Sequence, residues 1–249
     1  EADARRMLGD VAGIEIVPGR FGDIWLRDTG AIFAAAGQGP SAVGFRFNGW
    51  GGKYELEHDD EVAGQIAEAS GTPLNPQAFV LEGGALDHDG AGTVLTTRQC
   101  LLNPNRNPGW TEAAAEAALA GALGARKVLW LGDGLANDHT DGHVDNLARF
   151  VGPASVVCPV AWGRGDVNAA AYDACAADLS SMTDAQGRKL KVTRIPSPGW
   201  VEGHEGGSAA PASHMNFIIA NGAVVLPTYG DEQAGRLAAE VLQALFTDR

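Results

Sequence analysis

The feature that most constrains the fold is a helix that recurs along the chain. Four Ala-rich stretches have a composition that favours helix. Each follows a residue whose side-chain oxygen can accept hydrogen bonds from the free amides of a first helical turn, namely Asp59, Thr111, Asp166 and Asp231. We therefore expect helices over 60–71, 112–124, 167–179 and 232–246, at intervals of roughly 50 to 65 residues.

Short β-rich runs fill the intervals between these helices. They combine Val, Ile, Phe and Trp with polar residues, and Gly or Pro interrupts them. The turn sequences DHDGAG and ANGA predict hairpins, which a strictly parallel βαβ sheet would not contain. A propeller of ββαβ blades accounts for the helices and the hairpins better than a doubly wound sheet does.

Composition restricts the class of partner. The chain has 249 residues, 45% of them hydrophobic, and a net charge of −13, so it suits a sizeable core and a small cationic ligand. An acidic protein repels nucleic acid and anionic membrane surfaces, and we expect neither as a partner. There is no long apolar run that predicts a membrane helix. The three cysteines, Cys100, Cys158 and Cys175, are too few for a disulfide framework, which favours the cytoplasm.

The stretch HTDGHVDN places four ionisable side chains at every second position, His139, Asp141, His143 and Asp145. Such a group is hard to satisfy by chance, because buried polar side chains need partners. His and Asp are both metal ligands, so one hypothesis is a metal site. The other is a general acid/base with a carboxylate anchor for a substrate.

The metal hypothesis finds little further support. HTDGHVD loosely resembles the HxHxDH motif of metallo-β-lactamase-type hydrolases, but its histidines are four residues apart with a glycine between them. The remaining histidines lie in unrelated contexts, at His58, His88, His204 and His214. We therefore expect no metal. A structural alternative stays open, in which the motif supplies polar strand-end residues that bond to the backbone.

Other polar residues stand at the expected ends of strands. Arg27 and Asp28 follow Trp25 in the run 23–36, and a surface pair beside a buried Trp is an equally good reading. Glu82 ends an apolar run before two glycines, which permit either a simple turn or the close approach of a ligand.

The run 144–152 is expected to be a strand that begins near Val144. Side chains alternate between the two faces of a strand, so His143 and Asp145 would share a face.

Several motifs together resemble one family. They are DIWLRDTGAIF, FNGWGGKY, LEGGALDHDG, TTRQCLLNPNRNPG, DGHVDNLARFV and PASHMNFIIANGAVVLPTYGD. Their order and spacing, from about Gly22 onward, are similar to agmatine deiminase (agmatine iminohydrolase) of the guanidino-group-modifying, or pentein, superfamily, close to the peptidyl-arginine deiminase type. The resemblance implies a five-bladed α/β propeller of ββαβ repeats with a central active site, so residues 1–249 would form a single catalytic domain.

The resemblance also implies a chemistry. The substrate would be agmatine, whose planar cation carboxylates can hold by paired hydrogen bonds. A cysteine thiolate would form a covalent thiouronium intermediate, and water would release N-carbamoylputrescine, a step of putrescine and polyamine biosynthesis. No metal or organic cofactor would be needed. The implied site residues are the carboxylate grips Asp28 and Asp145, the general acid/base His143, the orienting Glu82, and the substrate-lining Trp25 and Asn216.

The chain departs from the family pattern at its nucleophile. The family nucleophile follows a glycine-rich segment ending GGGNIHC, whereas this sequence ends at LFTDR and has no such motif. Cys100 matches a family cysteine away from the nucleophile position, while Cys158 and Cys175 resemble small apolar core residues. The sequence also starts at Glu1 rather than Met. We therefore expect this sequence to be incomplete at both ends and to lack parts of the first and last blades.

Three functional hypotheses remain open. The chain is the core of an agmatine deiminase, of a deiminase acting on another guanidine such as peptidyl-arginine or arginine, or of a non-catalytic guanidine-binding relative. His214 and Ala31 stand where the family usually has Tyr and Pro, and both could alter the fit of a substrate. The oligomeric state is also open, a homo-oligomer included.

Overall fold

A single supersecondary unit, an antiparallel hairpin followed by a helix and a parallel strand, repeats along the chain. The structure is a computed structural model that describes residues 2–8, 11–36, 39–203 and 206–249. Two-residue and longer turns join the antiparallel strands, and a crossover helix returns the chain to a third, parallel strand, as parallel pairing requires. Three sheets share this order, β1-β2-β3, β4-β5-β6 and β7-β8-β9.

The three complete repeats have similar lengths. The first comprises β1 (Ile32–Ala36), β2 (Gly39–Arg46), α4 (Val62–Ala69) and β3 (Leu74–Val80). The second comprises β4 (Asp87–His88), β5 (Thr93–Thr97), α6 (Glu112–Leu123) and β6 (Lys127–Leu131). The third comprises β7 (Arg149–Gly152), β8 (Ser155–Val160), α7 (Ala169–Ser181) and β9 (Lys191–Pro196). A fourth unit has the hairpin β10 (Ile218–Ile219) and β11 (Val224–Val225) and the helix α8 (Glu232–Leu245).

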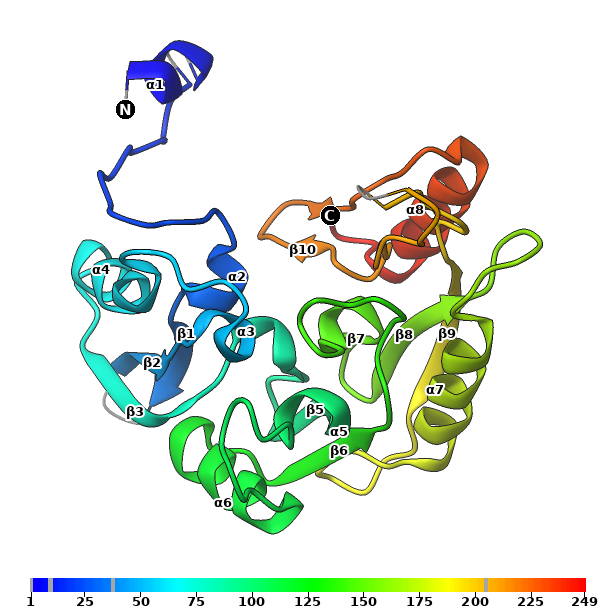
Figure 1. Cartoon of the computed structure of the whole chain (residues 1–249), viewed down its shortest axis with the longest axis horizontal. Helices are drawn as coiled ribbons and strands as arrows, with labels where there is room; N and C mark the ends of the chain where they lie inside the picture. The colour runs from blue at the N-terminus through cyan, green and yellow to red at the C-terminus, as the bar shows by residue number, and fades with distance from the viewer. Residues whose placement is uncertain (1, 9–10, 37–38, 204–205) are drawn as a thin grey trace.

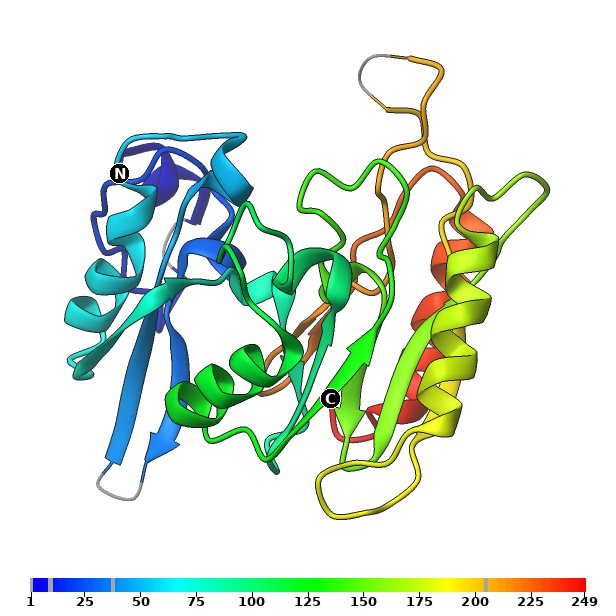
Figure 2. The ribbon, with the colours of Figure 1, turned by 60° about the horizontal axis from the view of Figure 1, so that its bottom comes forward.

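The units follow one another around an arc, with α4, α6 and α7 on its outer side (Figure 1). Adjacent units share their cores, because side chains on a strand alternate between two faces. On β8, Val156 packs in the cluster that contains Leu179 of α7, whereas Val157 packs with Leu242 of α8. The third sheet therefore lies between its own helix and that of the next unit, and the two helices are seen together in Figure 2.

The expected helices and hairpins are confirmed, and the three ββαβ repeats establish a mixed α/β fold. Thr111 and Asp231 cap their helices as predicted, by accepting from the amides of Ala114 and Ala234. A fifth blade stays a prediction. None of the described helices is both long enough and apolar enough to span a membrane.

Two predicted caps were wrong because their carboxylates have partners elsewhere. Helix α4 begins at Val62, and Asp59 instead accepts from the amides of Gly22 and Asp23. Helix α7 begins at Ala169, three residues after Asp166. The Asp166 carboxylate accepts from the amide of Asn168, the amide of Trp162 and the hydroxyl of Ser197.

Two predicted strands were wrong at their beginnings. In the run 23–36, residues 26–29 form the short helix α2 (Leu26–Thr29), so Arg27 and Asp28 are helical and do not end a strand. In the run 144–152, the turn η3 (Val144–Asn146) precedes a strand that begins only at Arg149. His143 and Asp145 therefore do not share a strand face, and their positions depend on the turn.

Candidate active site

Two short elements from distant parts of the sequence meet at the turn η2 (Gly83–Ala85), which follows β3. Helix α2 supplies Asp28, and the segment around η3 supplies His143 and Asp145. The Gly84 amide donates to Asp28 Oδ1 at 2.9 Å, and His143 Nδ1 lies 3.6 Å from the same oxygen. One atom from each of Asp28, His143 and Asp145 lies within 4.8 Å of the others.

Gly84 lies at the point where these three side chains converge. A Cβ atom built there would lie 2.6 Å from Asp28 Oδ1, 2.6 Å from His143 Nδ1 and 2.8 Å from Asp145 Oδ2. The φ of Gly84 is not positive, so the position requires glycine for space and not for backbone conformation. The sequence had left open whether the glycines after Glu82 form a simple turn or allow close approach, and at Gly84 the structure has both.

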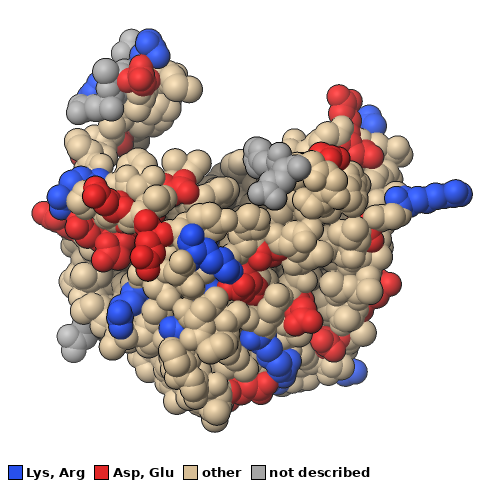
Figure 3. All heavy atoms as spheres, in the orientation of Figure 1, with Lys and Arg blue, Asp and Glu red and all other residues tan. Residues whose placement is uncertain are grey.

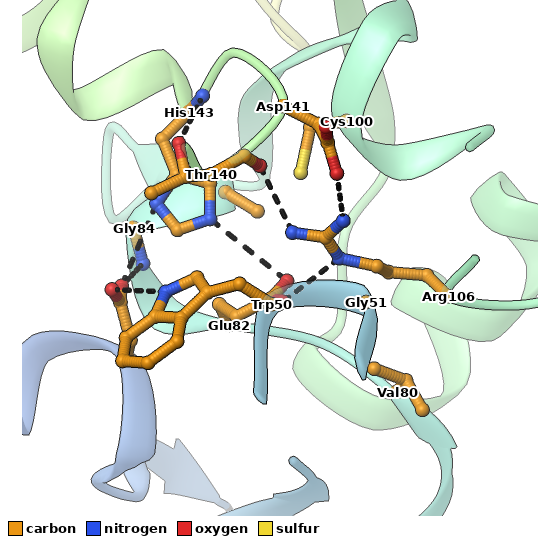
Figure 4. Close-up of polar contacts among 12 residues, drawn as sticks. Trp50, Gly51, Val80, Glu82, Gly84, Cys100, Arg106, Thr140, Asp141 and His143 are labelled. Atoms are coloured by element: carbon orange, nitrogen blue, oxygen red, sulfur yellow. Dashed lines mark hydrogen bonds and ion pairs between the residues drawn. The ribbon is translucent and has the colours of Figure 1, made fainter. Parts of the chain in front are cut away.

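Trp50 holds the second oxygen of Asp28, by donating from Nε1 to Oδ2 at 3.0 Å (Figure 4). Its element α3 (Gly49–Gly52) is a left-handed turn, in which Trp50 has a φ of 54° and Gly51 a φ of 82°. A large residue in this region is strained and needs support from its surroundings. The Asn48 side chain supplies part of it, by accepting from the Gly51 amide at 2.9 Å.

His143 and Glu82 face each other in the buried part of the site. His143 Nε2 lies 3.9 Å from Glu82 Oε2, and neither atom has a hydrogen-bond partner among the residues that the structure describes. Glu82 Oε1 accepts from Arg106 Nε at 2.8 Å. The two ring nitrogens of His143 therefore face different carboxylates, Nδ1 toward Asp28 and Nε2 toward Glu82 (Figure 4).

The charges of the site shift the pKa values of its members. Burial lowers the pKa of His143, but the Asp28 carboxylate, the Cys100 thiol and Glu82 outweigh it and raise that pKa well above its ordinary value. Burial raises the pKa of Glu82, but His143 and Arg106 bring it below its ordinary value. The arrangement therefore favours a protonated imidazole beside an ionised Glu82.

Asp145 is more deeply buried than Asp28, with 3% of its side chain exposed against 10%. Burial and the negative charge of Asp28 raise the pKa of Asp145 to about 6, and the positive charges of His143 and Arg27 counteract this rise only in part. Arg27 Nε lies 3.5 Å from Asp145 Oδ2, and Oδ1 has no hydrogen-bond partner among the described residues. A cation brought to Oδ1 would supply the missing partner and favour the ionised carboxylate.

Two sets of side chains could in principle hold a metal ion, Glu82 with Cys100 and His143, and Asp28 with His143 and Asp145. His139 belongs to neither set in the described part of the chain. Its Nδ1 is 2.5 Å from the hydroxyl of Tyr54, and the two rings are stacked. Cys100, in α5 (Arg98–Leu101), is fully buried, and burial raises the pKa of its thiol.

Asp141 points away from Asp28 and into a second group of charges. Its Oδ1 lies 2.5 Å from Lys53 Nζ, and its Oδ2 accepts from Asn105 and from Arg106. Burial opposes ionisation, but these three partners lower the pKa of Asp141 below its ordinary value.

The two predicted substrate-lining residues lie at the edge of the group. Trp25 directly precedes α2 and is 57% exposed, and its carbonyl accepts from the amides of Asp28 and Thr29. Asn216 donates to the side chain of Asn146 at 3.1 Å, next to Asp145 in the sequence.

Sequence reasoning missed the roles of Gly84, Trp50 and Arg106 in this group. Trp50 has a local signal, since it stands between glycines in FNGWGGKY, a pattern typical of an unusual backbone. Arg106 has no such signal, because a charged residue in the loop LNPNRNPG is ordinarily exposed.

A pocket of about 860 Å³ opens beside Gly83, at the other end of the same turn, and Arg27, Asp87 and Arg149 are among its lining residues. Arg149 is held by Asp87 at 2.9 Å and by the carbonyls of Met215 and Phe217. Two guanidinium groups in its wall make this pocket less suitable for a cationic ligand than the space at Gly84.

Comparisons with known proteins place the chain among deiminases. The model of the Porphyromonas-type peptidyl-arginine deiminase family matches residues 1–249. The agmatine deiminase of Pseudomonas fluorescens (strain SBW25) is 38% identical, over 98% of this chain and 72% of that protein. The agmatine deiminase of Ectopseudomonas mendocina (strain ymp) is 39% identical, over 99% of this chain and 73% of that protein.

Solved structures agree with these relatives. A structure of the Enterococcus faecalis agmatine deiminase, described as catalyzing its reaction, superposes with a TM-score of 0.84 and 38% identity, over 90% of this chain and 67% of that one. A cysteine-to-serine variant of the C. jejuni agmatine deiminase with substrate bound superposes with a TM-score of 0.87 and 26% identity, over 100% of this chain and 73% of that one.

Proposed function

The chain belongs to the Porphyromonas-type peptidyl-arginine deiminase family, and we propose that it deiminates agmatine to N-carbamoylputrescine and ammonia. Its relatives are hydrolases that act on a C–N bond. The observation that carries the proposal is the convergence of Asp28, His143 and Asp145 on the space beside Gly84. Two carboxylates and a protonated imidazole in one small space suit a guanidinium whose leaving group needs a proton.

The two carboxylates suit a planar cation. Trp50 and the Gly84 amide fix the two oxygens of Asp28, so the carboxylate is oriented before a ligand arrives. Asp145 retains the unpartnered Oδ1, and its Oδ2 already accommodates the guanidinium of Arg27 at 3.5 Å. A bound guanidinium would donate to both carboxylates and keep Asp145 ionised in spite of its burial.

His143 supplies the proton transfers in this proposal. Its pKa, raised by Asp28, Cys100 and Glu82, favours the protonated ring, which can give a proton to the departing ammonia. The neutral ring then takes a proton from the water that attacks the intermediate. Glu82, facing Nε2, favours the protonated ring and orients it.

The covalent steps need a thiolate. We propose that it attacks the guanidinium carbon, that a C–S bond forms as the C–N bond to ammonia breaks, and that water then releases the ureido product and the thiolate. Cys100 is unsuited because it is fully buried with a raised pKa, and Cys158 and Cys175 pack in the core of the third unit. The family motif GGGNIHC is the expected source of the nucleophile, and a five-bladed propeller is the expected complete fold.

The surface is compatible with a cationic substrate. Acidic side chains gather on the side of the molecule that carries α4 (Figure 3). They include the exposed Glu55, Glu57, Asp60 and Glu61, in the segment that follows Tyr54. Such a field attracts small cations over a distance and repels nucleic acid. We also propose that the enzyme is cytoplasmic and needs no metal or organic cofactor.

The proposal is tested with the full-length protein that contains this chain. Ammonia and ureido product are measured with agmatine, arginine and an arginine-containing peptide, since the family description favours peptidyl-arginine as a second candidate. We expect agmatine to have the highest kcat/KM. Turnover of the peptide alone would replace agmatine by peptidyl-arginine, and turnover of none would favour a non-catalytic guanidine-binding protein.

The carboxylates are tested by Asp28→Asn and Asp145→Asn. Charge-assisted hydrogen bonds contribute about 1.5–3 kcal/mol each, so each variant should lower kcat/KM by about tenfold to a hundredfold while the protein stays folded. Asp133→Asn is the matched control, because Asp133 is exposed and outside this group. Wild-type turnover in both site variants would refute the clamp, as would a loss of turnover explained entirely by unfolding.

A further inference from the structure

Arg106 is a buried, charged side chain that the proposed chemistry does not use. It lies in the loop between α5 and α6, and its side chain is only 1% exposed. Burial of a guanidinium is unfavourable unless hydrogen bonds and an opposite charge compensate for it. A residue of this kind is therefore expected to have a specific task.

The hydrogen bonds of Arg106 connect Glu82 with Thr140 and Asp141. Nε donates to Glu82 Oε1 at 2.8 Å, and Nη1 donates to Asn105 Oδ1 at 2.9 Å and to Asp141 Oδ2. Nη2 donates to the carbonyl of Thr140 at 2.9 Å. Because these four bonds occupy most of the five N–H groups of a guanidinium, Arg106 has little capacity left for a ligand.

Two neighbours favour the ionised form of Glu82, first His143 and then Arg106. The groups that face its carboxylate are Arg106 from the loop, His143 from the segment before η3 and the Cys100 thiol from α5. Of these three, only Arg106 carries a permanent positive charge. Its position on Oε1 leaves Oε2 directed at His143 Nε2, 3.9 Å away.

Asp141 completes the arrangement. Its backbone has a φ of 62°, in the left-handed region, and Gly142 follows with a φ of 84°. The turn directs Asp141 toward Arg106 and Lys53, while His143 and Asp145 of the same motif face Asp28 and Gly84.

We propose that Arg106, anchored by Asp141, is a positioning residue of the site, which keeps the Glu82 carboxylate ionised and turned toward Nε2 of His143. The inference rests on the proposed roles of Glu82 and His143 in deimination. It gives Asp141 of the alternating motif a task distinct from substrate binding. Loss of Arg106 should therefore lower kcat far more than it changes KM, because Arg106 does not touch the substrate.

The first test measures the ionisation of Glu82 directly and needs no turnover. The side-chain carboxyl resonance of Glu82 is followed by ¹³C NMR during a pH titration, and Glu82→Gln identifies the signal. In Arg106→Gln, which keeps a polar amide but removes the charge, the pKa of Glu82 should rise by about one unit or more. In Arg106→Lys, which keeps the charge, the rise should be distinctly smaller.

The second test uses the pH dependence of kcat in the full-length protein with agmatine. If Glu82 must be ionised, the acidic limb should move to higher pH in Arg106→Gln and remain near the wild-type position in Arg106→Lys. Leu242→Ala is the control for general destabilisation, since Leu242 of α8 packs in a hydrophobic core, and it should lower the melting temperature without moving the limb.

The two tests separate the inference from the function. An unchanged Glu82 titration in Arg106→Gln overturns the role of Arg106, even if agmatine turnover is established. If the wild-type protein does not act on agmatine, the titration still decides whether Arg106 controls Glu82. Should Arg106→Gln fail to fold, Arg106→Met, which removes the same charge but keeps an unbranched side chain, should raise the pKa of Glu82 in the same direction, and no rise there refutes the inference.

Discussion

Replacement of Gly84 by alanine tests the geometry of the site with a single methyl group. The new carbon would lie 2.6 Å from Asp28 Oδ1 and His143 Nδ1 and 2.8 Å from Asp145 Oδ2. These separations are far below van der Waals contact, so each of the three atoms has to move. The backbone of Gly84 has no positive φ, so alanine adds no conformational strain of its own.

The size of the effect follows from the displacement. Accommodating the methyl group requires shifts of several tenths of an ångström to about 1 Å, and a misplacement of about 1 Å can lower a rate about hundredfold. We therefore expect kcat/KM for agmatine to fall by about a hundredfold or more, which corresponds to about 2.7 kcal/mol of transition-state stabilisation. Overpacking of a buried site also destabilises a fold, here by about 1–3 kcal/mol.

The assay is steady-state ammonia release by the full-length protein, with thermal unfolding measured in parallel. Gly121→Ala is the matched control, because Gly121 lies in α6 and a Cβ there meets nothing within 4 Å. Alanine should stabilise that exposed helical position by about 0.5–1 kcal/mol and leave turnover unchanged. Near-wild-type turnover in Gly84→Ala would refute the reasoning, because the three side chains then could not need that space.

Three further outcomes are expected. Trp50→Phe removes the donor to Asp28 Oδ2 and should lower kcat/KM several-fold, as the loss of about 1 kcal/mol predicts; an unchanged value would mean that the indole does not orient Asp28. Burial lowers the pKa of His214, so on acidification the unfolded state binds the proton first. The free energy of unfolding should therefore fall as the pH drops below about 6.5 toward the folded-state pKa. His214→Phe should reduce the accompanying fall in melting temperature, and an identical pH profile would contradict the assignment. Treatment with a chelator should change neither turnover nor melting temperature, and stoichiometric zinc in a tag-free sample would count against the metal-free mechanism.

Much of the architecture follows from local sequence. Helical composition and turn residues act over a few neighbouring positions, so the four helices and the hairpins at 87–92 and 220–223 could be placed without tertiary information. The helix caps show the limit of prediction from local sequence. Thr111 and Asp231 bond to their own first turns, whereas Asp59 accepts from amides 36 and 37 residues away. An aspartate has the same local pattern in either case, and only the folded chain decides which donor reaches it.

The candidate site, too, could be predicted from the sequence only in part. The alternating motif 139–146 indicated a group of ionisable residues with a common purpose. The resemblance to deiminases, which the relatives confirm, predicted that the site contains Asp28, Glu82, His143 and Asp145. The expected strand at Val144 was wrong because residues 144–146 form the turn η3, in which the Val144 carbonyl accepts from the amides of Leu147 and Ala148.

Only the tertiary structure decided which residues support that group. Gly84 meets Asp28 across 56 residues of sequence, Arg106 meets Glu82 across 24, and Trp50 meets Asp28 across 22. Periodicity and composition describe neighbours along the chain, and they contain no information on which loops of separate repeats come together. The charge of Glu82, the orientation of Asp28 and the space beside Gly84 depend on these loop contacts, so they appear only when the repeats are packed around their common centre.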